Sequence, residues 1–253
     1  MMKNNKERDI VEYQRVYNEL PFEEYQVQFR RKKVLEHINE RKPKRILEIG
    51  CGNEPLFKEN LDVEQWIVVE PGKQFFKKAK AEAKENVILM NAFFEDCVKQ
   101  ILDLKIDIDY VVCSGLLHEL DNPEALLQSI YKVCGENTIV HINVPNSKSI
   151  HRLLAVEMGL IQDVYVQSEQ QKMMQQSNVV YDIESLIKIC EKNGLKVINE
   201  GSYFVKPFTH KQMQQCLDNG VFDINLLNGL DKIIKYMPEY GSEIFVECKR
   251  IIT

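Results

Sequence analysis

The sequence is short of several features that would point to other classes of protein. Only 11 glycines and 8 prolines occur among its 253 residues, too few for a collagen-like or disordered chain. Its 7 cysteines are scattered and form no Cys-x-x-Cys pair, so they predict neither a disulfide framework nor a structural zinc site. No window approaches the roughly 18 uncharged apolar residues of a membrane span, and the first residues lack the apolar core of a signal peptide. We therefore expect a soluble, cytoplasmic protein with reduced cysteines.

An excess of positive charge is also missing. The chain carries 33 Lys and Arg against 38 Asp and Glu, a net charge of -5, and no local basic cluster compensates. Such a balance does not attract a nucleic-acid backbone. The histidines and carboxylates show no metal-ligand spacing, so no metal is expected. Neither a monomer nor a homodimer is favoured by the residues.

What the sequence does contain is an alternation of short apolar runs with helix-like stretches. The apolar runs cover 45–50, 66–70, 87–92, 108–115 and 137–144. Helical patterns fall between them, at 54–61, 72–84, 93–102 and 122–134. Parallel strands buried on both faces look like this, and the alternation predicts right-handed βαβ units. With two further strands at 195–205 and 243–251, we expect an α/β fold with a doubly wound, mostly parallel sheet of seven strands.

Segments outside this alternation predict appended pieces. Residues 1–42 form an N-terminal helical extension that Pro21 divides, and 43–253 form the main domain. Helical insertions are expected after strands five and six, at about 146–180 and 207–239. The aromatic stripe of the extension, which includes Tyr17, indicates either core packing or a lid.

The segment ILEIGCGNEP (46–55) has the order strand, acidic residue, Gly-x-Gly, helix start. Glycine lets the backbone turn sharply and approach a ligand. A dinucleotide fingerprint needs a third small residue where Pro55 stands, which disfavours a nicotinamide oxidoreductase. Glu48 lies inside the strand, where its carboxylate suits an amino group better than a pyrophosphate. Glu70 ends the next strand, 18 residues past Gly52, and is placed to accept hydrogen bonds from ribose hydroxyls.

Together these residues resemble a class I S-adenosylmethionine-dependent methyltransferase. The resemblance covers roughly 40–145 and rests on the loop, on Glu70, on Asn91-Ala92 after the third strand, and on DYVVCSGLLHELDNPEAL (109–126). Two departures are Glu54, where the family usually has its third glycine, and the order His118-Glu119, which the family commonly has reversed. Segments 143–161, 206–214 and 238–247 also look similar to methyltransferases of bacterial surface-polysaccharide clusters.

The resemblance implies S-adenosylmethionine as cofactor. The loop would hold its methionine part, the acid after strand two its ribose, and the end of strand three its adenine. The expected cofactor-binding residues are Glu48, Gly50, Cys51, Gly52, Glu70, Pro71, Asn91, Ala92 and Ser114.

The acceptor should meet the methyl group above strands four and five, between the loops 114–121 and 143–151. The expected catalytic residues are His118 as general base, Asn143 and His151, and the expected substrate-binding residues are Glu119, Asn146, Arg152 and Tyr17. Alternatives stay open for several of them. His118 could instead cap its loop, Glu119 could face solvent, and His151 and Arg152 could face an anionic or hydroxylated substrate at a helix N-terminus. His141 reads as a core histidine, and Lys206 and His210 as residues of a solvated loop.

These features predict a methyltransferase for a small molecule. The main hypothesis is O-methylation of a sugar or nucleotide-linked precursor of a cell-surface glycan. One alternative is a protein that binds the methyl donor without transferase activity, as a sensor or partner subunit. Another is N-methylation of a small metabolite. SGLLHEL after strand four lacks the Asn/Asp-Pro-Pro-aromatic signature of methyltransferases that act on nucleobase amino groups.

Overall fold

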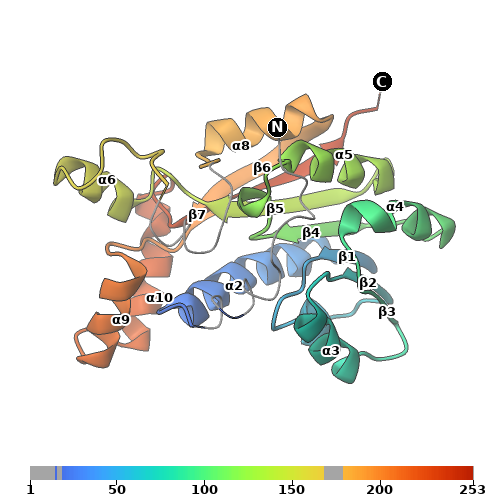
Figure 1. Cartoon of the computed structure of the whole chain (residues 1–253), viewed down its shortest axis with the longest axis horizontal. Coiled ribbons are helices and arrows are strands. Elements are labelled where there is room, and N and C mark those ends of the chain that lie inside the picture. Colours follow the sequence, from blue (N-terminus) through green and yellow to red (C-terminus); the bar gives the residue numbers. More distant parts are fainter. Residues whose placement is uncertain (1–14, 16–18, 168–178, 253) are drawn as a thin grey trace.

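The computed structural model describes residues 15, 19–167 and 179–252. Its centre is a seven-stranded sheet in the order β3-β2-β1-β4-β5-β7-β6 (Figure 1). The strands are β1 (Arg45–Ile49), β2 (Gln65–Val69), β3 (Val87–Met90), β4 (Tyr110–Ser114), β5 (Ile139–Pro145), β6 (Leu195–Tyr203) and β7 (Glu243–Arg250). The first five pair in parallel, and β7 runs antiparallel to both β5 and β6. The predicted doubly wound, mostly parallel sheet is confirmed.

Helices cover both faces of the sheet. On one face lie α2 (Glu23–Arg41) and α3 (Lys73–Glu82), and on the other α4 (Phe94–Asp103), α5 (Pro123–Val133) and α8 (Ile183–Lys192). Beyond one end of the sheet lie α6 (Ile150–Glu157), α9 (His210–Asp218) and α10 (Ile224–Lys232) (Figure 1). Short 3-10 turns are η2 (Leu56–Lys58), η3 (Leu117–Glu119) and η4 (Ile233–Tyr236). No helix in the described ranges has the length and apolarity to cross a bilayer.

The core divides into two layers because neighbouring strand residues point to opposite faces. In β1, Leu47 packs with the helices α4, α5 and α8, whereas Ile46 packs with α2 and α3. The same alternation places Val111 and Tyr110 of β4 in different layers. Both layers are apolar, which is why the strands read as unbroken apolar runs.

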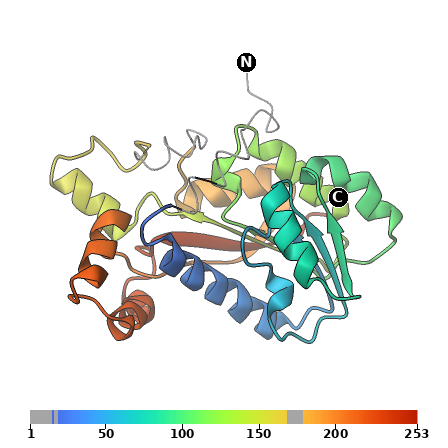
Figure 2. The ribbon, with the colours of Figure 1, turned by 60° about the horizontal axis from the view of Figure 1, so that its bottom comes forward.

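A third cluster joins the two ends of the chain. Phe22 and Phe29 of the N-terminal segment pack with Phe204, Met213 of α9 and Leu227 of α10. The rings of Phe29 and Phe204 stack with centroids 4.1 Å apart and planes 10° apart. Figure 2 shows this C-terminal helical pair beside the start of α2, at one end of the sheet. The cluster therefore gives the 207–239 segment its place, against the start of α2.

The helix predicted over 54–61 is wrong in length, since only η2 forms there. Pro55, before the turn, and Glu59, after it, both have non-helical backbone conformations. The backbone N–H of Leu56 donates to the carboxylate of Glu48, at 3.1 and 3.2 Å. That side chain supplies the partner that this N-terminal N–H would otherwise lack, and it ties the start of η2 to β1.

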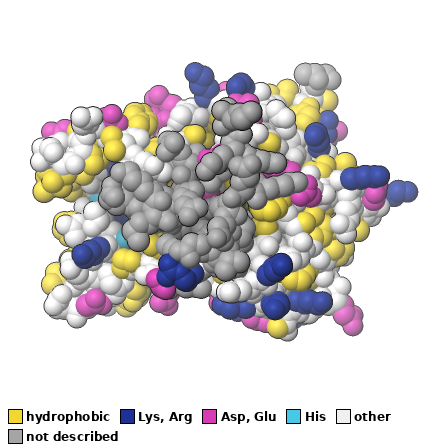
Figure 3. Space-filling view, in the orientation of Figure 1, with side chains coloured by type: hydrophobic (Ala, Val, Ile, Leu, Met, Phe, Trp, Pro, Cys, Tyr) yellow, Lys and Arg dark blue, Asp and Glu magenta, His cyan; other side chains and the backbone are white. Residues whose placement is uncertain are grey.

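On the outer surface, charges of both signs are mixed. On the face drawn in Figure 3, lysine, arginine, aspartate and glutamate side chains alternate with apolar ones over the described residues.

A buried polar cluster lies between α2 and the sheet. Its centre is Glu247 of β7, which is fully buried and accepts hydrogen bonds from Arg41 (2.8 Å), Asn199 (2.9 Å) and Tyr110 (2.9 Å). His141 is also fully buried beside it, as predicted for a core histidine.

Replacing this carboxylate should reveal its contribution to stability. Burial opposes the charged form of Glu247, but hydrogen bonds from Arg41 and Asn199 lower its pKa from 4.5 to about 2. Because the pKa is lower in the folded state, its contribution is present above pH 4.5 and is lost as the pH falls towards 2. We expect Glu247→Gln to lower the free energy of unfolding by about 1–3 kcal/mol at pH 7. Urea unfolding at pH 7 and near pH 3 should show this difference shrinking in acid.

The matched control is Glu40→Gln on the exposed side of α2, which should change little at either pH. A loss of stability in Glu247→Gln that is equally large at both pH values would contradict the assignment of the effect to charge.

Candidate functional site

A cleft of about 1580 Å³ opens above the carboxyl ends of β1, β2, β4 and β5. Such an edge is where open α/β sheets bind ligands. The loops after β1 and β2 form one end of the cleft, which we call the donor half. The turn η3, the start of α2, the start of α6 and the segment after β6 form the other end, which we call the acceptor half.

The donor half is shaped by a loop that only glycine accommodates easily. Gly50 and Gly52 have φ angles of 75° and 56°, in the left-handed region. The N–H of Gly50 donates to the carbonyl of Val69 at 2.8 Å, which ties the loop to β2. The backbone therefore turns back at the sheet edge without side chains that would fill the space beside it.

Glu70 fastens this loop to the loop after β2. Its carboxylate is 4% exposed, and its two oxygens accept the N–H groups of Gly72 (2.7 Å) and Gly52 (3.1 Å). Burial raises the pKa of Glu70, while these backbone hydrogen bonds oppose the rise. Each carboxylate oxygen can accept more than one hydrogen bond, so capacity is left for a pair of vicinal hydroxyls.

Glu48 is the second buried acid of the donor half. It is 4% exposed, it lines the cleft, and burial raises its pKa to about 8. A carboxylate held this far from water is stabilised when a cation binds beside it. The residues of the donor half thus fit a ligand with a ribose and an ammonium group, as S-adenosylmethionine has.

Most of the expected cofactor-binding residues line this half of the cleft. They are Glu48, Gly50, Cys51, Gly52, Glu70, Pro71 and Ser114. Asn91 and Ala92 do not line it. The amide of Asn91 instead donates to the carbonyls of Glu70 (2.7 Å) and Pro71 (3.2 Å), so it supports the ribose loop from behind. Phe75 and Phe93, which the sequence did not single out, add apolar surface suited to an adenine ring.

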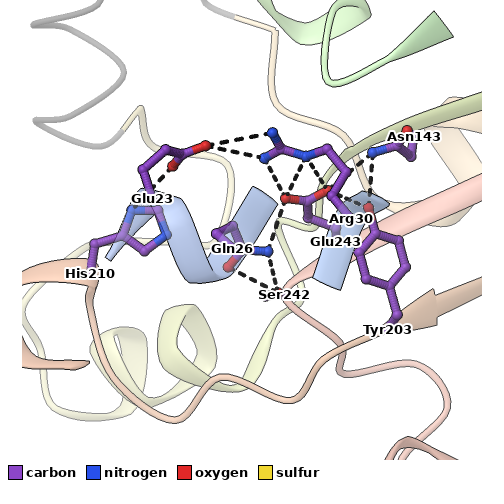
Figure 4. Close-up of polar contacts among 8 residues, drawn as sticks. All are labelled: Glu23, Gln26, Arg30, Asn143, Tyr203, His210, Ser242 and Glu243. Carbon is purple, nitrogen blue, oxygen red and sulfur yellow. Dashed lines mark hydrogen bonds and ion pairs between the residues drawn. The ribbon is translucent and has the colours of Figure 1, made fainter. Parts of the chain in front are cut away.

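The acceptor half is organised around Glu243, the first residue of β7 (Figure 4). This carboxylate is 2% exposed and accepts hydrogen bonds from Gln26 (2.9 Å), Arg30 (2.6 to 3.1 Å) and Asn143 (3.1 Å), and from the hydroxyl of Tyr203. Burial opposes ionisation, but the charge and hydrogen bonds of Arg30 hold the pKa of Glu243 below its usual value. One buried anion therefore joins α2 to β5, β6 and β7.

A second acid, Glu23, continues this network towards α9. Its carboxylate lies 3.5 Å from Arg30 and 3.9 Å from Nδ1 of His210 (Figure 4). Burial raises the pKa of Glu23, and the charge of Arg30 opposes the rise. The wall of the acceptor half is consequently polar, buried and already ordered by its own contacts.

Five of the residues expected around the acceptor line the cleft. They are His118, Glu119, Asn146, His151 and Arg152. Asn143 is fully buried beneath the wall, where its amide donates to Tyr203 and Glu243, so the structure gives it a supporting position. Asn146 uses its amide on the carbonyls of Glu239 and Gly241. Tyr17 lies outside the described residues.

The expectation of a solvated loop at Lys206 and His210 is wrong. Lys206 is 5% exposed and the side chain of His210 is 13% exposed, and both line the cleft. The side chain of Phe204 packs in the aromatic cluster with Phe22 and Phe29, and this contact places the residues that follow it against α2. Arg30 and Glu243 were missed as well. The available signal was Glu243 at the start of the apolar run EIFV (243–246), since charge in a buried strand needs a partner.

No group of histidine, cysteine or acidic side chains suited to a metal ion occurs in the part of the chain that the structure describes.

The fold and the donor half agree with the comparisons with known proteins. A family model described as a methyltransferase domain matches residues 22–200, well over half of the chain, so the chain belongs to the methyltransferase domain family. S-adenosylmethionine is its cofactor, as the loop, Glu48 and Glu70 lead one to expect. No protein of curated function matches the chain.

Several solved structures share the fold at low identity. An S-adenosylmethionine-dependent methyltransferase from Thermotoga maritima, described as a possible histamine N-methyltransferase, is 14% identical over 94% of this chain and 97% of its own, with a TM-score of 0.57. One from Archaeoglobus fulgidus is 15% identical over 89% and 98%, with a TM-score of 0.54. The 1,6-didemethyltoxoflavin N1-methyltransferase of Burkholderia thailandensis, solved with its substrate and S-adenosylhomocysteine, is 10% identical over 88% and 77%, with a TM-score of 0.50.

Removing the ribose-facing acid should weaken donor binding. Glu70→Ala deletes a carboxylate that can accept charge-assisted hydrogen bonds and also frees Gly52 and Gly72. We expect the dissociation constant of S-adenosylhomocysteine to rise about 10- to 100-fold, measured by calorimetric titration. Glu85→Ala, an exposed acid before β3, is the control. Equal affinities of the two variants would contradict the role of Glu70.

Glu48 should release a proton when the donor binds. With a pKa of about 8, most of this carboxyl is protonated at pH 7, and an ammonium group beside it favours the ionised form. Calorimetry in buffers of different ionisation enthalpy should therefore show proton release on binding of S-adenosylhomocysteine at pH 7. Glu48→Gln, which can still accept from Leu56, should abolish that release. Release of the same size in the variant would show that another group titrates.

Proposed function

We propose that this methyltransferase methylates a hydroxyl group of a small molecule, a sugar or nucleotide-linked precursor of a cell-surface glycan. The observation that carries the proposal is the acceptor half, a wall of buried polar side chains continuous with the donor half. Hydroxyl-rich molecules are recognised by dense, ordered hydrogen-bonding groups of this kind. The resemblance of 143–161, 206–214 and 238–247 to methyltransferases of surface-polysaccharide clusters supports the glycan. A nucleotide-linked precursor would also agree with the cytoplasmic location expected from the sequence.

The chemistry that S-adenosylmethionine supplies when bound is a methyl group on a positively charged sulfur. Transfer of this methyl group to the acceptor oxygen would leave a neutral thioether. The hydroxyl proton must go to a base. The protein contributes alignment of the two reactants in one cleft, which accounts for most of the acceleration in such displacements.

His118 is the proposed base. It follows β4 on η3, is 6% exposed, and lines the cleft next to the Ser114 end of the donor half. Glu243 lies close enough that the charge of His118 lowers the pKa of this carboxyl. By the same interaction, Glu243 stabilises the imidazolium that forms when His118 takes the proton.

The remaining expected residues have supporting roles in this proposal. Glu119 on η3 and Arg152 on α6 would contact the acceptor, and Asn146 would hold the loop that leads into α6. Nδ1 of His151 lies 3.1 Å from the hydroxyl of Ser149, and burial lowers the pKa of His151 well below its usual value. Its neutral ring can then hydrogen-bond a hydroxyl. Residues 1–42 stay a proposed lid, to which α2 contributes Glu23, Gln26 and Arg30 in the cleft wall.

N-methylation of a small amine is the second candidate, because the wall also contains acids. Glu23 and Glu119 are buried in it and would suit a cationic amine. The description of the Thermotoga structure points the same way, although a likeness at this identity extends to the fold alone.

The test is methyl transfer from radiolabelled S-adenosylmethionine to a panel of nucleotide sugars and a panel of small amines. For the acceptor that is methylated, we expect His118→Gln to lower kcat about 100-fold or more and to remove the rise of kcat between pH 6 and 8, as loss of a general base does. Binding of S-adenosylhomocysteine should stay within about twofold, since the donor half is untouched.

Lys132→Gln on α5, outside the cleft, is the control and should match the wild type. Methylation of amines alone would replace the main proposal by the second candidate. Donor binding without transfer to either panel would favour a donor-binding sensor or partner subunit, and full activity of His118→Gln would remove this residue as the base.

A further inference from the structure

Lys206 is a buried cation in the cleft wall without an ion pair. Its side chain follows β6, is 5% exposed, and lines the acceptor half. Among the described residues, no carboxylate lies within the 4.0 Å of an ion pair from its Nζ, and none accepts a hydrogen bond from it. Burying an ammonium group without an ion pair costs free energy unless another group compensates its charge.

Arg152 is a second cation of this kind. It lies in the first turn of α6 and lines the same half of the cleft. Its guanidinium donates only to backbone carbonyls, those of Val164 (2.7 and 3.0 Å) and Val166, and no described carboxylate forms an ion pair with it. Burial lowers the pKa of Arg152 while the charge of Asp163, beyond ion-pair distance, opposes the fall, and the charges of Arg152 and Lys206 repel each other.

The acids of the same wall are already engaged. Glu243 is saturated by Arg30, Gln26, Asn143 and Tyr203, and Glu23 lies against Arg30 and His210. Glu23 and Glu243 still attract the charge of Lys206, but over distances longer than that of an ion pair. The two free cations therefore share one side of the cleft with the start of α6. There the N-cap Ser149 spends its hydroxyl on His151 rather than on the backbone, so the positive end of the helix dipole is uncapped by a side chain.

From this arrangement we infer that the acceptor carries an anionic group, a phosphate or a carboxylate, and that Lys206 and Arg152 bind it at the start of α6. The inference rests on the proposed function and narrows its substrate class to acidic acceptors. The anion would supply the charge partner that both cations lack, and its hydrogen bonds would be charge-assisted and shielded from water.

The experiment uses sulfate and acetate as probes of the two anion classes, titrated into the full chain saturated with S-adenosylhomocysteine and followed by NMR. We expect Lys206→Met to weaken binding of the preferred anion by about tenfold or more, the effect of losing one charge-assisted hydrogen bond. Lys196→Met, at an exposed position of β6 outside the cleft, should stay within about twofold. Preference for sulfate indicates a phosphate-bearing acceptor, and preference for acetate a carboxylate.

Two further readouts separate binding from a folding defect. Methionine fits a buried position, so Lys206→Met should unfold at no lower temperature than the wild type, and the anion should raise the unfolding temperature of the wild type only. Burial also lowers the pKa of Lys206 to about 7; the charges of Glu23 and Glu243 oppose this shift, and those of Arg30 and Arg152 add to it. Sulfate keeps its charge in this range, so its affinity for the wild type should fall between pH 6.5 and 8.5 and stay flat in the variant.

Equal anion affinity of the wild type and Lys206→Met, or no binding of either anion to the wild type, would overturn the inference. S-adenosylhomocysteine is titrated into the same samples first. If S-adenosylhomocysteine binds, but the anions bind the wild type and Lys206→Met equally or not at all, the acidic acceptor is excluded and the methyltransferase proposal stands. If it does not bind, the proposed function itself fails.

Discussion

The acceptor half depends on the pairing of one buried carboxylate with one arginine. Glu243 and Arg30 are joined by three hydrogen bonds of 2.6 to 3.1 Å, with Glu243 almost inaccessible to solvent. Around this pair are gathered an amide from β5, a hydroxyl from β6 and an amide from α2. Removing either member would leave a buried charge without its partner, which costs far more than the pair itself contributes. The pair therefore fixes where α2 lies on the sheet, and with it one wall of the cleft.

The two halves of the cleft differ in electrostatic character. In the donor half the buried charges are two acids, Glu48 and Glu70, which suits a ligand that carries a sulfonium and an ammonium group. In the acceptor half Glu243 and Glu23 are paired with Arg30, whereas Lys206 and Arg152 form no ion pair with a described carboxylate. A cationic donor and an anionic acceptor would each find the opposite charge at its own end. The division would keep each ligand from occupying the other's place.

How much could be read from the sequence depends on the range of the contacts involved. The strands, their order of appearance and the donor loop follow from local signals, namely apolar runs, glycines and an acid at a strand end. Glu48 and Glu70 could be identified as site residues from the sequence, because residues close to them along the chain also lie close to them in the structure. Lys206 is not, because its burial is caused by the stacking of Phe204 on Phe29, 175 positions earlier along the chain (204 minus 29). The same holds for Arg30, whose partner in β7 no periodicity reveals.

The contact between α2 and β7 also orders the assembly of the protein in time. Arg30 and Glu243 are separated by 213 positions, and β7 follows all the other strands along the chain. On a ribosome, the loops of the donor half are complete once β4 has emerged, whereas α2 must wait for the last strand before its charges are neutralised. The acceptor half therefore cannot be completed before β7 is in place, so a chain that ends before this strand lacks a finished place for a substrate.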